Sequence, residues 1–156
     1  MRDDIKSLFA DLLKHLNLKS ELLHSLLEKE KSISNLLKYT NDIEDSIKKI
    51  IDDENSLIAE IDVEDYNISH IRDEITRRYG FDFNKISING YKPSEDEIAD
   101  YKKEILLHKQ IITDLIKFKK ENNSYLEKCS DDLKVQVSEL ESIERLRYVI
   151  KDLQSS

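Results

Sequence analysis

The residues that break helices are confined to one short segment of this 156-residue chain. Its only two glycines, Gly80 and Gly90, and its only proline, Pro93, lie within fourteen positions of one another. Glycine and proline destabilise a helix interior by about 1 and 3 kcal/mol, respectively. The sequence therefore predicts an all-α fold, with long helices on both sides of one loop at residues 79–93.

The composition indicates a thin body rather than a compact one. Charged residues make up 37% of the chain, hydrophobic residues 38%, and there is no tryptophan. An ordinary globular domain carries about 25% charged residues. We therefore expect a single elongated helical domain over residues 1–156, in which a narrow line of Leu and Ile forms the core.

The formal net charge of −8 is concentrated in residues 42–65, which hold ten acidic residues and two lysines. This acidic belt argues against binding to nucleic acid or to an anionic membrane surface. Either a solvated helix face or a docking surface for a basic partner would account for it. No apolar run reaches the ~20 residues that span a bilayer, and the N-terminus lacks a secretory pattern. Together with a lone cysteine, Cys129, these features predict a cytoplasmic protein.

A heptad pattern without a phase shift can be laid on residues 5–78. We call its first and fourth positions the seam, and fifteen of these 22 positions are apolar, as in helices of coiled-coil type. The first positions are Ile5, Leu12, Lys19, Leu26, Ile33, Thr40, Ile47, Glu54, Ile61, Ile68 and Ile75. The fourth positions are Leu8, His15, Leu22, Lys29, Leu36, Ile43, Ile50, Leu57, Glu64, Ile71 and Arg78. Further apolar residues beside the seam widen the stripe, so that it needs more than one partner helix.

A second seam follows the loop, from Ile98 to Ile150. Eleven of its sixteen positions are apolar when Tyr101 and Cys129 are counted. Its polar positions include Lys119, Asn122 and Gln136. Isolated polar residues at such positions fix the register of helices, usually by pairing with one another.

A break near residue 40 is predicted by a capping pattern and by length. Asn41 with Glu44 matches a capping box. At 1.5 Å per residue, an unbroken first helix would be about 110 Å long against about 85 Å for the second, and folding would cover the surplus apolar stripe. The predicted helices are therefore about 3–39, 42–78 and 95–152, with a single long first helix as the alternative.

The loop alternates apolar and polar residues from Phe81 to Tyr91. A period of two is typical of strands, so a short hairpin is one interpretation. The favoured interpretation is an irregular loop whose aromatic side chains cover the end of the helical bundle.

Motifs for catalysis or for metal binding are missing from the sequence. No two of the four histidines have the spacing of a helical zinc site, and they do not form the pair of Glu-x-x-His motifs of a di-iron bundle. His15 and His108 lie on the seam, where a histidine is usually a tolerated core residue. Cys129 is expected to be a buried apolar residue, and no glycine-rich phosphate loop exists. We predict no enzymatic activity, no cofactor and no metal, because a narrow seam offers no water-excluding pocket.

Interaction with another helix is the remaining function class. Ile111, Phe118 and Tyr125 recur every seven residues beside the second seam. This stripe either packs against the first helices or receives a partner's amphipathic helix. The residues predicted to contact a partner are Ile111, Phe118, Asn122, Tyr125, Leu126, Leu133, Val137 and Leu140.

Four segments resemble a known protein family. They are LLHSLLEKE at 22–30, the stretch from DIE at 42–44 to ENSLIAEI at 54–61, RRYG at 77–80, and ENNSYLEKCS at 121–130. With these segments the chain is similar to the flagellar export chaperone family named FlgN, in which a glycine closes the second helix.

The resemblance implies a cytoplasmic chaperone without enzymatic activity. Such proteins bind the aggregation-prone terminal helices of hook-associated junction proteins, prevent their premature assembly and deliver them to the type III export gate. A disordered amphipathic tail would become ordered on the seam, at a cost in affinity that suits later release. The alternative function is a structural coiled-coil scaffold that self-associates, and both a monomer and a dimer remain open.

Overall fold

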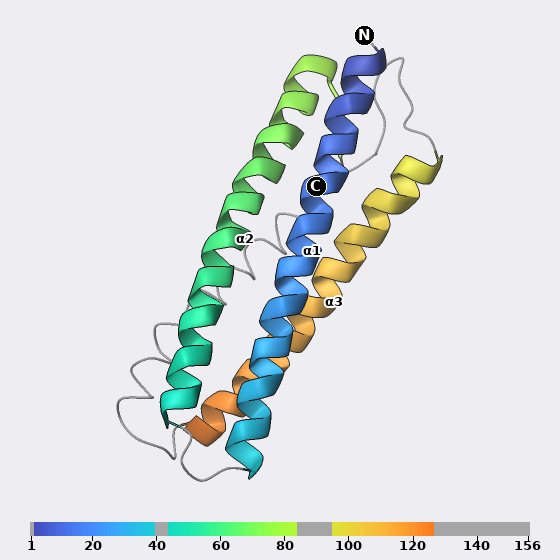
Figure 1. Ribbon diagram of the computed structural model, residues 1–156. Coiled ribbons are helices and arrows are strands. Elements are labelled where there is room, and N and C mark those ends of the chain that lie inside the picture. Colours follow the sequence, from blue (N-terminus) through green and yellow to red (C-terminus); the bar gives the residue numbers. More distant parts are fainter. Residues whose placement is uncertain (1, 40–43, 84–94, 127–156) are drawn as a thin grey trace.

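The computed structural model describes residues 2–39, 44–83 and 95–126, which form three long helices (Figure 1). Helix α1 spans Arg2–Tyr39, α2 spans Glu44–Tyr79 and α3 spans Glu95–Leu126. The predicted all-α bundle is confirmed, and the first helical segment is two helices rather than one. The capping box at Asn41 and the predicted continuation of α3 to residue 152 lie outside the described residues.

Helix α1 is the common neighbour of the other two helices. Figure 1 shows α2 returning antiparallel to α1, whereas α3 runs in the same direction as α1 and crosses it. Contacts agree with this direction, because Tyr101 lies against Phe9 near the start of both helices and Asn122 bonds to Glu30 further along. The fold is therefore an antiparallel pair with a third helix laid along α1.

Burial follows the heptad pattern closely. Every described first position of the α1–α2 seam is buried, whether it is apolar or charged. The described fourth positions are half-buried, apart from the exposed Arg78. Helix α3 thus covers one side of the α1–α2 seam, and the other side remains partly open to solvent.

The apolar core is divided into two clusters along the bundle. One cluster is aliphatic, and its members include Leu26, Ile61 and Ile112, one from each helix. The other lies at the opposite end and is rich in aromatic side chains, among them Phe9 and Tyr101. Aromatic edge contacts contribute about 0.5–1.5 kcal/mol per pair beyond their buried area.

Gly80 ends α2 as the sequence predicts. Its φ is +65°, the left-handed conformation that glycine adopts without steric cost, and its N–H donates to the Thr76 carbonyl at 2.9 Å. The chain then turns into the bundle, so that Phe81 and Phe83 are buried against Phe9 and Tyr101. These two aromatic residues cover the bundle end as predicted, and residues 84–93 lie outside the described part.

A first polar layer separates the two apolar clusters. We call it the Lys19 layer: Lys19 Nζ lies 2.6 Å from Asp65 Oδ1 of α2, and His108 Nε2 of α3 donates to the Leu16 carbonyl at 2.8 Å. Burial lowers the pKa of Lys19 and raises that of Asp65, although their pairing opposes both shifts. Burial also lowers the pKa of His108 to about 4, so its imidazole is neutral at pH 7.

A second polar layer lies within the aliphatic half. We call it the Glu30 layer: Asn122 Nδ2 donates to the Glu30 carbonyl and to Glu30 Oε1, both at 3.0 Å, and Lys119 Nζ is 3.6 Å from that carboxylate oxygen. The polar seam residues of α3 are thus paired, through a glutamate of α1. Burial and a hydrogen bond with Glu30 raise the pKa of Glu54 far above its usual range, which keeps Glu54 protonated at neutral pH.

Candidate functional site

The partly open side of the α1–α2 seam carries two polar bridges between the helices. His15 Nδ1 donates to Glu64 Oε2 at 2.6 Å, and further along α1 Lys29 Nζ lies 3.3 Å from Asp53 Oδ2. Because α1 and α2 are antiparallel, the two bridges mark two levels of the same boundary. The Lys19–Asp65 pair also joins α1 to α2 in this stretch, with its lysine side chain only 1% exposed. The candidate site lies between the two more exposed bridges.

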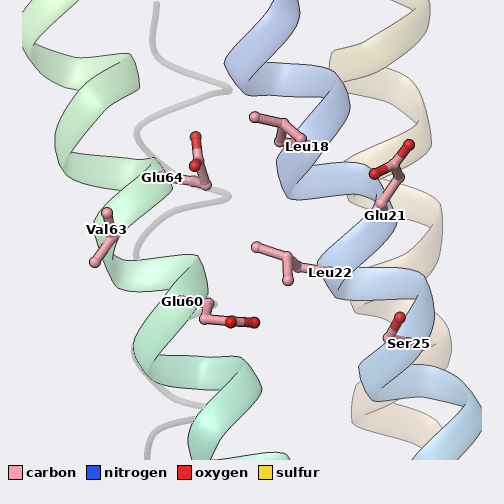
Figure 2. Close-up of a pocket in the computed structure, with 7 residues that line it drawn as sticks. All are labelled: Leu18, Glu21, Leu22, Ser25, Glu60, Val63 and Glu64. Carbon is pink, nitrogen blue, oxygen red and sulfur yellow. The ribbon is translucent and has the colours of Figure 1, made fainter.

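A groove of about 440 Å³ occupies this stretch (Figure 2). Its apolar surface comes from Leu18 and Leu22 of α1, which point toward α2, and from Val63 of α2. Leu18 and Leu22 are one turn apart and half-buried, whereas Val63 is 58% exposed. The groove is an open strip of aliphatic surface rather than an enclosed pocket, so it suits a side-chain stripe better than a small molecule.

The polar residues of the groove are mostly acidic. Glu60 extends from α2 toward α1 and Glu64 lies on the side of α2 that faces α1, whereas Glu21 and Ser25 lie on the side of α1 away from α2 (Figure 2). The lining includes no lysine or arginine. The acidic belt of residues 42–65 therefore has a place in the fold, because its last part borders an apolar groove.

Apolar exposure continues beyond the groove along α2. Tyr66 is 70% exposed, and its ring stacks on that of His70 with centroids 6.1 Å apart and planes 8° from parallel. Val63, Tyr66 and His70 follow the three- and four-residue spacing of one helix face. This exposed face extends the apolar surface that a bound helix could contact.

The partner-binding residues predicted from sequence lie on α3 and divide into different environments. Ile111 and Asn122 are buried, and Phe118 is half-buried against the aliphatic cluster. Tyr125 is 43% exposed. The side chain of Leu126 is not described, and Leu133, Val137 and Leu140 lie outside the described residues. The described part of the stripe thus packs mainly against the first helices. This is one of the two interpretations that the sequence left open, and the other was contact with a partner's helix.

The described residues offer no site for metal chemistry. No group of three or more His, Cys, Asp or Glu side chains within residues 2–39, 44–83 and 95–126 is arranged to hold a metal ion. His15 and His108 make the hydrogen bonds given above, and Cys129 lies outside the described part. None of the described helices has the length and apolarity needed to cross a membrane.

No family model, curated protein or solved structure matches this chain. The similarity to FlgN therefore rests on the four sequence segments alone. The groove, in contrast, is observed in the structure.

Sequence reasoning did not find the groove. Leu18 and Val63 fall outside the heptad seam, so the pattern that predicted the core gave no reason to select them. The acidic belt was the available signal, because its alternative interpretation was a docking surface for a basic partner. The acidic belt did not reveal the apolar surface beside it, because locating that surface requires knowing how α1 packs against α2.

Proposed function

We propose that this protein is a binding module that holds an amphipathic helix of a partner protein in the α1–α2 groove. The observation that carries the proposal is the apolar strip of Leu18, Leu22 and Val63, which the bundle leaves uncovered between two polar bridges. Helix-in-groove recognition buries the apolar face of an amphipathic segment on such a surface. The internal pairing of α1 with α2 supports a monomeric module over a self-associating rod.

The specific form of this proposal is an export chaperone of the FlgN kind. In this form the partner is the terminal helix of a hook-associated junction protein, kept from premature assembly in the cytoplasm and delivered to the export apparatus. The support is the sequence resemblance together with an uncovered apolar groove. A chaperone needs a partner site that is accessible before the partner arrives, and an open strip meets that need.

The test is calorimetric titration of the full chain with terminal peptides of hook-associated junction proteins. We expect a 1:1 complex that Val63→Glu weakens at least tenfold, since a charge would be placed on the apolar strip. Leu106→Glu is the matched control, because Leu106 on α3 is 56% exposed and lies away from the groove lining.

Two results would contradict the proposal. Equal weakening by both variants would exclude the groove as the binding site. A stable dimer by light scattering, together with no binding of any junction peptide, would favour the self-associating scaffold.

A further inference from the structure

The distance between the two polar bridges limits the length of helix that the groove can hold. The bridges leave α1 at His15 and at Lys29. Fourteen residues of helix at 1.5 Å per residue span about 21 Å, or about four turns. A helix lying in this window would be about two heptads long and would contact Leu18 and Leu22 of the strip along about one turn of α1, and a longer helix would meet the polar bridges instead.

The charges beside the strip define the flanks of that helix. Carboxylates come from both helices, with Glu21 on α1 and Glu60 and Glu64 on α2. Glu64 is engaged with His15, whereas no described cation pairs with Glu21 or Glu60. A partner with acidic flanks would be repelled, and one with lysine or arginine on both flanks would satisfy these carboxylates, as flanking charges do in coiled coils.

We infer that the groove selects an amphipathic helix of about two heptads with basic residues on both sides of its apolar stripe. The inference rests on the proposed function and adds the length and charge of the partner segment. Three observations support it together: the spacing of the bridges, the apolar strip and the carboxylates on both helices. The surrounding belt, with ten acidic residues and two lysines over 42–65, favours the same sign of charge.

Synthetic peptides that share one apolar stripe test whether the groove selects basic flanks. Three helical peptides of 14 residues would carry Lys, Gln or Glu at the flanking positions and be titrated against the full chain at low and high salt. We expect the Lys peptide to bind about tenfold tighter than the Gln peptide at low salt, the Glu peptide to bind weakest, and salt to reduce these differences. A 28-residue Lys peptide is expected to bind no more than about twofold tighter than the shorter one.

Charge reversal of the rim separates local recognition from net charge. Glu60→Lys is expected to weaken the Lys peptide about tenfold and to strengthen the Glu peptide. Asp114→Lys is the matched control, because Asp114 is an exposed acid on α3 and its reversal changes the net charge equally. An equal effect of both variants would overturn the inference.

The remaining outcomes distinguish this inference from the proposed function. If the Lys and Gln peptides bind equally and Val63→Glu abolishes both, helix binding survives and the charge selection is wrong. If affinity rises steadily up to 28 residues, the length limit is wrong. If no peptide binds the full chain, including junction-protein peptides, both the inference and the proposed function fail.

Discussion

The Lys19 layer and the Glu30 layer both place charged side chains in a narrow helical core, and they differ in their access to water. In the Lys19 layer the cation is 1% exposed, but its partner Asp65 has a side chain that is 21% exposed. In the Glu30 layer the Lys119 side chain is 7% exposed and that of Glu30 is 0% exposed. Water can therefore hydrate one charged group of the Lys19 layer but hardly any charged group of the Glu30 layer.

This difference decides which groups stay ionised. A half-exposed carboxylate stabilises a buried lysine at moderate cost, because solvent continues to hydrate one member of the pair. Two buried carboxyl groups beside one lysine cannot both ionise cheaply, so Glu54 keeps its proton. Buried charged residues thus give an ion pair in the Lys19 layer and, in the Glu30 layer, a cluster in which Glu54 is protonated.

The largest predicted effect comes from removing the cation of the Glu30 layer. Lys119→Met leaves the fully buried Glu30 without its ion-pair partner, and we expect the free energy of unfolding at pH 7 to fall by about 3–5 kcal/mol. Lys19→Met is the matched variant, with an expected loss of about 1–2 kcal/mol because Asp65 can be rehydrated. Urea denaturation followed by circular dichroism measures both, and equal losses would remove the proposed difference between the layers.

The acid limb of the stability curve tests the Lys19 layer. The pKa of His108 is about 4 in the native state against 6.5 as a free side chain, so between these values the unfolded state binds a proton that the native state does not. The stability that comes from keeping His108 neutral is complete above pH 6.5 and is lost as the pH falls through 4. The free energy of unfolding decreases by at most about 3 kcal/mol over this range. His108→Gln, which keeps a donor for the Leu16 carbonyl, is expected to flatten the curve there.

The histidine prediction has a direct check by NMR. Titration of the imidazole signals is expected to place the pKa of His108 well below the value of 6.5 for a free side chain. The carbonyl of Leu16 favours the charged form, and burial together with the nearby Lys19 disfavours it. A His108 that titrates near 6.5 would contradict the buried layer.

The smallest predicted effect is a gain of stability in the Glu30 layer. Glu54→Gln replaces a protonated carboxyl group with a neutral group of similar shape, so we expect stability at pH 7 to rise by about 1 kcal/mol. The raised pKa of Glu54 means that wild-type stability is complete below the unfolded value of 4.5 and falls as the pH rises toward the native value. The gain is therefore expected to vanish near pH 4 and to grow toward pH 9 in denaturation curves, and a loss at pH 7 would mean that Glu54 is ionised.

The heptad pattern predicted the core because burial in long helices depends on local spacing. It placed Lys19, Glu54 and Asn122 on the buried side as correctly as it placed leucines. It could not predict their partners, since the residues that contact them are distant in sequence. Asn122 and Glu30 are 92 positions apart, and only the direction of α3 along α1 brings them together.

The groove was beyond sequence reasoning for a similar reason. Its ends depend on two bridges, one of which joins residues 49 positions apart and the other residues 24 positions apart. Its apolar surface includes Val63, which faces solvent and breaks the polar pattern of the outer face of α2. The predicted stripe on α3 was based on a regular seven-residue spacing. In the fold, much of that stripe packs against the first helices.

The central position of α1 also determines how the bundle can open. Helix α1 is covered by α3 on one side and by α2 on another. Swinging α3 outward would expose the Phe9–Tyr101 contact but leave the Lys19–Asp65 pair closed, whereas swinging α2 outward would do the reverse. Amide hydrogens of α1 are thus protected by whichever neighbour remains, and their slowest exchange requires both to leave.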